Sequence, residues 1–209
     1  MISGIDALDR LREGNARFVA NESRPSDAAD QALRARLVAG QAPFAIVLGC
    51  SDSRVPAELV FDQGFGDLFV IRVAGNIVAP SQVGSVEFAA ARFGTPLVVV
   101  LGHTRCGAIL ATLEELRGPT HHSANLRSIV DRVRPSVEKL LSQGNRRGID
   151  ETLLIGHAVR ANVRASVEHL RHGSAVLEEL IRAGNLMVVG AEYSLETGVV
   201  DFFEETGND

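Results

Sequence analysis

Short apolar runs alternate with helical stripes along the chain. Mostly apolar runs at 44–48, 68–73, 97–101 and 186–190 predict buried parallel strands. A further run at 199–203 follows the fourth after only a short turn, which favours an antiparallel edge strand. Because strands and helices alternate, we predict an α/β fold: a central, mostly parallel sheet of about four parallel strands plus an antiparallel edge strand, flanked by helices.

Helical spacing of apolar residues begins near the N-terminus. Ile5, Leu8, Leu11 and Phe18 form one stripe, so residues 1–40 are expected to be an N-terminal helical arm within a single domain covering 1–209. Polar residues around Pro25 and at 144–148 predict loops. Helices are expected over these ranges: 4–20, a second ending near 40, 55–61, 82–93, 106–117, 123–141, 155–173 and 174–183.

Composition narrows the possible partners and the compartment. The formal net charge is −5, and no cluster of Lys and Arg stands out, which argues against a nucleic-acid partner. No apolar run reaches the roughly 18 residues of a membrane span. Residues 1–10 carry Asp6 and Asp9 and lack the apolar core of a signal peptide, so we expect a cytoplasmic protein without a membrane partner.

Three candidate metal ligands follow two of the predicted strands. Cys50 follows the run at 44–48 after one glycine, and His103 and Cys106 follow the run at 97–101. Carboxyl ends of parallel strands meet at one edge of a sheet, where ligands bind. Two thiolates and one imidazole make the Cys₂His set of a catalytic zinc with an open fourth position. The chain has 2 cysteines, too few for a closed Cys₃His or Cys₄ structural site.

The environment of these ligands also suggests catalysis. Asp52 and Arg54 lie beside the first cysteine and can act on the metal site, although neighbouring Asp and Arg often form ordinary surface ion pairs. Cys106 is expected to open a helix, whose N-terminal N–H groups favour a thiolate over a thiol.

The motifs at these positions resemble the β-class carbonic anhydrases. The resemblance implies reversible, zinc-dependent hydration of carbon dioxide to bicarbonate and a proton by zinc-bound hydroxide. It also implies one zinc per subunit and a homodimer or homotetramer. The matching stretches cover almost the whole chain: EGNARF at 13–18, CSDSR at 50–54, DLFVIR at 67–72 with Asn76, GHTRCGA at 102–108, GAEY at 190–193 and TG at 197–198.

The position of Asp52 and Arg54 beside the first ligand suggests their roles. Asp52 would accept the hydrogen of the hydroxide in a hydrogen bond, and Arg54 would keep Asp52 ionised and away from the metal. The resemblance adds a substrate pocket. The pocket that it implies consists of Gln41 as a donor to bicarbonate, Phe69, Ala74 and Phe88 as apolar walls, and the Gly107 backbone near the metal. Phe88 stands where the family often has Tyr, and Ala74 where it often has a larger aliphatic residue, so these departures affect pocket size.

Two further features follow from the resemblance. Val47 stands where members with a bicarbonate-controlled switch have Trp, so we expect a permanently open fourth zinc position. The N-terminal helical region would lie against a partner subunit, whereas the simpler alternative from the residues alone is a helix packed on its own sheet.

Other interpretations remain open at this stage. The same fold can hydrolyse a carbon dioxide analogue such as CS₂, a structural zinc module would fill all metal positions with protein, and a redox protein would form a Cys50–Cys106 disulfide. Gly64 and Gly66 precede a strand, so a dinucleotide site is rejected. Helical spacing would allow His169 and His172 to bind a metal, but we favour solvated histidines at a helix C-terminus. The remaining histidines, at 121, 122 and 157, are not expected to belong to the metal site.

Overall fold

A parallel sheet forms the centre of the molecule. The computed structural model describes residues 2–24, 31–118, 123–142 and 150–204. In these ranges the sheet has the strand order β2-β1-β3-β4-β5; the first four strands run parallel, and β5 pairs with β4 in the antiparallel direction. The predicted α/β architecture is confirmed, but the strand at Leu68–Arg72 is not buried as expected: it lies at the edge of the sheet, and only Ile71 in it is buried. The strands are β1 (Ala45–Gly49), β2 (Leu68–Arg72), β3 (Leu97–His103), β4 (Met187–Tyr193) and β5 (Val200–Glu204).

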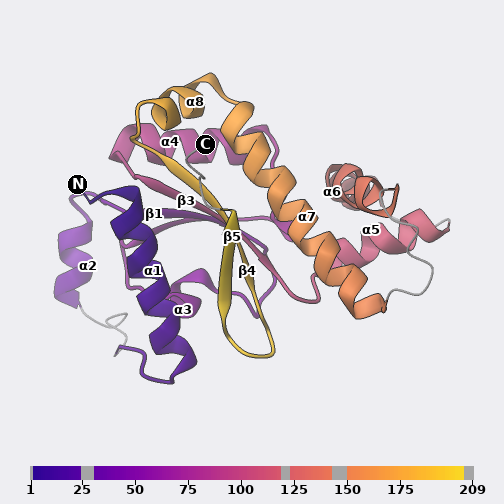
Figure 1. Ribbon diagram of the computed structural model, residues 1–209. Coiled ribbons are helices and arrows are strands. Elements are labelled where there is room, and N and C mark those ends of the chain that lie inside the picture. Colours follow the sequence, from indigo (N-terminus) through magenta and orange to yellow (C-terminus); the bar gives the residue numbers. More distant parts are fainter. Residues whose placement is uncertain (1, 25–30, 119–122, 143–149, 205–209) are drawn as a thin grey trace.

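Helices cover both faces of this sheet (Figure 1). Their predicted positions are confirmed to within a few residues, but the short 3₁₀ turn η2 was not predicted. Most of the expected loop around Pro25, the loop at 144–148, and His121 and His122 lie outside the described residues. The helices are α1 (Gly4–Val19), α2 (Gln31–Leu37), α3 (Ala57–Val60), η2 (Ala74–Asn76), α4 (Pro80–Phe93), α5 (Gly107–Arg117), α6 (Ala124–Ser142), α7 (Glu151–His172) and α8 (Ala175–Arg182).

Successive strand residues supply two separate hydrophobic layers. In β3, Val99 and Leu101 face α1 and α3, whereas Val98 and Val100 face α4, α7 and α8. Figure 1 shows α1 and α7 on opposite sides of the sheet. All seven residues of β3 are buried, which explains why its sequence is a continuous apolar run instead of an alternating one.

The N-terminal helix packs on its own sheet. Ser3 caps α1 in a reciprocal capping box with Asp6. Leu8 and Leu11 are buried in the layer that covers β1 and β3, as expected. The prediction that Ile5 belongs to the apolar stripe was wrong. Ile5 is 66% exposed, and Ala7 is the buried residue of that turn instead.

The strand order reverses between β1 and β3. From β1 the chain first adds β2 on one side and later adds β3 on the other. Helices that leave two such strands depart in opposite directions, so a crevice opens at the carboxyl ends of the strands. Gly49 pairs with Leu101, and this register places Cys50 beside the end of β3, where His103 lies.

Glycine at position 102 allows α7 to approach β3 closely. A β-carbon at Gly102 would lie 2.6 Å from Cγ2 of Val163 and 3.1 Å from Cγ1 of Val159. These distances are shorter than carbon–carbon contact. Gly102 therefore sets the distance between α7 and the strand that carries His103. None of the helices in the described part of the chain combines the length and apolar content that a bilayer crossing requires.

We predict that Gly102→Ala lowers the free energy of unfolding by about 1–3 kcal/mol, because the added methyl group overpacks the layer between β3 and α7. Urea unfolding measures the change. Gly84→Ala is the matched control, since a β-carbon there meets nothing within 4 Å, and its helical position should leave stability equal or higher. Equal stability of the Gly102 variant and the wild type would contradict the packing argument.

Candidate metal centre

Three side chains converge at the carboxyl ends of β1 and β3. One ligand atom from each of Cys50, His103 and Cys106 lies within 4.8 Å of the other two. All three residues are buried. Cys50 follows β1, His103 ends β3, and Cys106 is the N-cap of α5. Arg105 lies between His103 and Cys106 and has a φ of 56°. This left-handed residue turns the chain, so that His103 and Cys106 can face the same point.

One ring nitrogen of His103 is hydrogen-bonded, and the other has a free lone pair. Its Nδ1 lies 2.9 Å from the carbonyl oxygen of Thr104, so Nδ1 carries the proton and donates it to that oxygen. Its Nε2 is buried and has no hydrogen-bond partner among the described residues. A buried nitrogen lone pair without a partner costs free energy unless something binds it. Nε2 is therefore in the state that a metal ligand requires.

The pKa values of the two cysteines are shifted in opposite directions. A hydrogen bond from the Cys106 thiol lowers the pKa of Cys50 to about 4. The same contact raises the pKa of Cys106 above its usual value. The N–H groups of Ala108 and Ile109 act in the opposite direction, as expected at a helix N-terminus, but Cys50 outweighs them. A doubly charged cation would replace the shared proton and allow both thiolates to form, which fits Zn²⁺.

Asp52 forms a two-pronged ion pair beside this triangle. Arg54 donates from Nε to Oδ1 at 2.9 Å and from Nη2 to Oδ2 at 2.7 Å, and its backbone N–H also reaches Oδ1. These bonds hold the pKa of Asp52 well below its usual range. Oδ2 of Asp52 lies 3.9 Å from Nε2 of His103, and the side chain is only 17% exposed. Asp52 is therefore an ionised acceptor next to the metal position, held by Arg54.

Sequence reasoning missed Arg72. Its guanidinium donates to the carbonyl of Cys50 at 3.0 Å and to the carbonyl of Asp52 at 2.6 Å. Arg72 thereby fixes the backbone that carries the first ligand and the acceptor. It lies in a quoted motif, but only the strand register, which pairs Arg72 with Gly49, shows what it touches.

Comparisons with known proteins agree on one family. The family model described as "Carbonic anhydrase" matches residues 45–200. The chain belongs to the carbonic anhydrase family. It is 40% identical to carbonic anhydrase 2 of Mycobacterium tuberculosis over 98% of this chain and 95% of the relative. It is 39% identical to a carbonic anhydrase of Mycolicibacterium smegmatis over the same shares.

The fold and the ligand set identify the β class within this family. A structure described as a tetrameric β-carbonic anhydrase of the filamentous ascomycete Sordaria macrospora superimposes with a TM-score of 0.75, covering 95% of this chain and 97% of that one. At 21% identity this likeness shows the fold alone. The Cys₂His triangle at the strand ends provides the site that a zinc-dependent carbonic anhydrase of this class uses.

Among the remaining predicted site residues of this carbonic anhydrase, two lie close to the ligands in sequence and structure. Gly107 opens α5 directly after Cys106. Ala74 begins the turn η2, in which the N–H of Gly75 donates to Sγ of Cys50 at 3.3 Å. Gln41 lies in an exposed stretch before β1. The pocket roles of these residues remain predictions.

The two aromatic pocket residues lie on the edge strand and the helix beside it. Phe69 in β2 and Phe88 in α4 form an aromatic cluster with Phe93, with ring centroids 5.4 to 6.3 Å apart. Phe69 pairs with Ile46, whereas the ligands follow Gly49, so Phe69 lies roughly 10 Å before the carboxyl edge. Phe88 is 53% exposed. Within one subunit Phe69 is partly buried and packs against the core of the sheet, whereas Phe88 is largely exposed.

The other histidines of the described residues form no second metal group. His157, His169 and His172 are exposed. Nε2 of His172 lies 3.5 Å from Oε2 of Glu168, four residues earlier on α7. The interpretation of His169 and His172 as solvated helix-end residues agrees with their exposure. The two cysteines are free thiols, with no disulfide between them.

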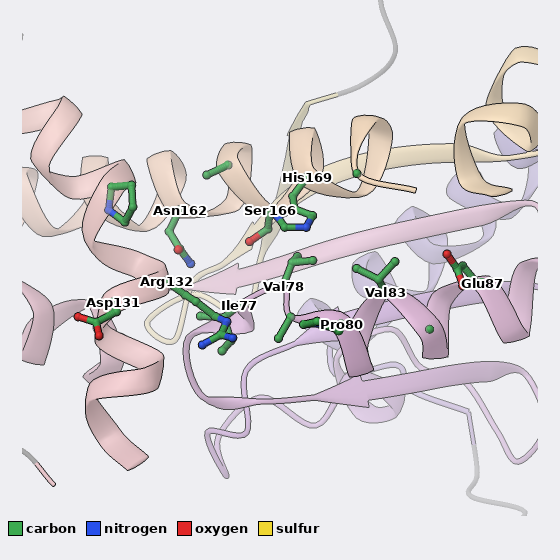
Figure 2. A pocket seen from close by; sticks show the side chains of 15 residues that line it. Ile77, Val78, Pro80, Val83, Glu87, Asp131, Arg132, Asn162, Ser166 and His169 are labelled. Atoms are coloured by element: carbon green, nitrogen blue, oxygen red, sulfur yellow. The ribbon is translucent and has the colours of Figure 1, made fainter. Parts of the chain in front are cut away.

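A separate pocket of about 760 Å³ lies between α4, α6 and α7. Figure 2 shows Asn162, Ser166 and His169 on one wall and Val83 and Glu87 on another. None of the three metal ligands lines it. Ile77, which does, also packs in the hydrophobic cluster that contains Cys50 and Cys106. Ile77 therefore belongs both to the lining of this pocket and to the apolar cluster around the two cysteines.

We predict that Cys50→Ser, His103→Ala and Cys106→Ser each weaken zinc binding by on the order of 100-fold or more, because three ligands leave no substitute. Zinc content after dialysis against a chelator measures the loss. His157→Ala, an exposed histidine on α7, serves as the control and should retain its zinc. A ligand variant that keeps a full equivalent of zinc would remove that residue from the site.

We also predict that apparent zinc affinity rises at least about tenfold per pH unit between pH 6 and 8. Both thiolates must form, and because the pKa of Cys106 is raised, its proton must be displaced throughout this range. Burial lowers the pKa of His103, but Cys50, the Thr104 carbonyl and Asp52 together raise it above its usual value, so the slope should steepen at the acidic end. Titration calorimetry in buffers of different ionisation enthalpy counts the released protons, and zero release would contradict this.

Proposed function

We infer that this chain catalyses the reversible hydration of carbon dioxide to bicarbonate and a proton, with one zinc ion per subunit. One observation carries the inference. Three ligand atoms converge within 4.8 Å, and an ionised carboxylate oxygen lies 3.9 Å from one of them without joining the triangle. Among the described residues, no fourth His, Cys, Asp or Glu completes the group, so the arrangement favours catalysis over a closed structural site.

The metal and the residues around it have different roles in the reaction. Zinc, when bound, supplies a Lewis acid that makes hydroxide available near neutral pH. Asp52, ionised by its pairing with Arg54, can accept a hydrogen bond from that hydroxide and so aim the oxygen lone pair at the carbon of carbon dioxide. The proton that water loses passes to solvent, and the new carbon–oxygen bond yields bicarbonate.

Arg54 and Arg72 keep Asp52 in place for this task. Arg54 occupies both carboxylate oxygens, which opposes rotation of Asp52 onto the metal. Arg72 anchors the backbone carbonyl of Asp52 itself. With Val47 where switching members have Trp, these contacts favour a permanently open fourth position.

A second copy of the chain would complete the substrate pocket. We propose that Phe69 and Phe88 line the pocket of a partner subunit, because Phe69 lies on the edge strand β2 and Phe88, on the neighbouring helix α4, is largely exposed. Ala74 and the Gly107 backbone would line the pocket of their own subunit. Gln41 would donate to a bicarbonate oxygen, since its exposed position before β1 leaves its amide free to reach across an interface.

Other exposed surfaces also support an assembly. Helix α2 has no buried residue of its own, and a helix of seven residues is unstable without packing. Ile5 on α1 and Val38 after α2 are exposed as well, at 66% and 87%. We propose a homodimer or a homotetramer in which this N-terminal arm contacts a partner. A monomeric boundary in sedimentation velocity would contradict the proposal.

Two broader proposals rest on the same residues. We place the protein in the cytoplasm, because two free cysteines that serve as metal ligands need a reducing compartment. We also propose that residues 1–209 form a single domain, since α1 and α7 cover opposite faces of one sheet.

Stopped-flow measurement of carbon dioxide hydration, paired with zinc stoichiometry, tests the proposed activity. Hydration that scales with zinc content and disappears on chelation is the expected result. A zinc-loaded protein without hydration activity would overturn it. Assaying CS₂ in parallel separates hydration from hydrolysis of the analogue.

We predict that Asp52→Asn retains zinc but lowers kcat/KM by about 100-fold, because an amide replaces an ionised acceptor without changing the ligands. Asp9→Asn is the matched control: Asp9 also pairs with a nearby arginine, Arg12, but on the exposed face of α1. The control should keep wild-type activity. If both variants stayed within twofold of wild type, the Asp52–Arg54 pair would be an ordinary surface ion pair.

A further inference from the structure

The turn η2 delivers a hydrogen bond to one metal ligand. The backbone N–H of Gly75 donates to Sγ of Cys50 at 3.3 Å. Gly75 and Asn76 both lie in the left-handed region, with φ of 71° and 42°. The N–H of Asn76 closes the turn on the carbonyl of Val73. Two consecutive left-handed residues are uncommon, and glycine has the widest conformational freedom of any residue. Contacts from elsewhere must therefore hold this turn in place.

Helix α7 supplies these contacts. Nδ2 of Asn162 donates to the carbonyl of Gly75 at 2.8 Å, and Oγ of Ser166 donates to the carbonyl of Asn76 at 3.1 Å. Asn162 and Ser166 lie four residues apart, so they share one face of the helix. Figure 2 shows both side chains extending from α7 on the same side. Both residues are buried, at 3% and 5% exposure.

Helix α5 packs against the turn as well. A β-carbon at Gly75 would lie 2.9 Å from the β-carbon of Ala108, two residues after Cys106. The turn therefore lies within contact distance of the helix that begins at the third ligand, and α7 holds it by hydrogen bonds. Movement of Gly75 would change the hydrogen bond to Cys50 first, because that N–H is the group directed at the metal site.

We propose that Asn162 is a positioning residue for the metal centre. Its amide fixes the conformation of Gly75, and Gly75 in turn keeps its N–H on the Cys50 sulfur. An N–H donor withdraws charge from a thiolate and so tunes a metal that the thiolate binds. Asn162 touches neither the metal position nor substrate, and 87 residues separate it from Gly75 in sequence. The proposal rests on Cys50 being a zinc ligand.

The test uses zinc affinity and the spectrum of the cobalt-substituted protein. Asn162→Ala removes the donor, and the adjoining pocket gives water access to the exposed carbonyl, which favours a folded variant. We expect the zinc Kd, measured by chelator competition, to rise about tenfold. The thiolate-to-cobalt charge-transfer band should move to lower energy, because a sulfur without its hydrogen bond gives up an electron more easily.

Ser166→Ala is the matched control. It removes a hydrogen bond from the next carbonyl of the same turn, but the N–H of Asn76 points to Val73 instead of a ligand. Both variants should lose some thermal stability, and only Asn162→Ala should shift the cobalt band. An unshifted band with wild-type zinc affinity in Asn162→Ala, or equal shifts in both variants, would overturn the proposal.

A second substitution covers the case in which Asn162→Ala does not fold. Asn162→Asp keeps the shape but places a carboxylate oxygen against the Gly75 carbonyl, so a larger Kd increase and band shift are expected. Wild-type protein separates this proposal from the proposed function. Absence of a thiolate-to-cobalt band in the wild type would reject the metal site itself, whereas a normal wild-type band that neither variant shifts rejects only the role of Asn162.

Discussion

The parallel pairing of β1 with β3 is the constraint on which the metal site depends. These strands are neighbours in the sheet although the chain forms β2 between them. Their register, Gly49 opposite Leu101, places the residue after β1 beside the end of β3. A slip of one residue would turn every side chain of a strand to the opposite face of the sheet. The apolar residues on both faces of β3 fix this register, so packing of the core also positions the ligands.

The same burial that fixes the register makes the site unfavourable without a metal. His103 is fully buried and its Nε2 has no partner in the described part of the chain, which costs about 1–3 kcal/mol. The thiols of Cys50 and Cys106 are packed together and cannot both ionise. Metal binding relieves both problems, so the free energy of binding also stabilises the carboxyl edge of the sheet.

The sequence revealed the strands and the ligands because each has a strong local signal. Continuous apolar runs marked the buried strands, and the spacing of His103 and Cys106 marked the metal site. Ile5 was placed wrongly because a short amphipathic helix tolerates more than one stripe. The bonds made by Arg72 and Asn162 could not be predicted, since each joins residues that only the folded sheet and α7 bring together.

The hydrogen bonds around Cys50 explain how a site with two thiolates can still activate water. Two thiolates offset both charges of Zn²⁺, so the centre attracts a further anion less than a three-histidine site would. Arg72 at the Cys50 carbonyl and the Gly75 N–H at the Cys50 sulfur both draw charge away from this ligand. Arg54 similarly offsets Asp52. The result is a nearly neutral centre, which suits a neutral substrate and favours release of an anionic product. Its reactivity then depends on the hydrogen bonds that β2, η2 and α7 supply from outside the ligand triangle.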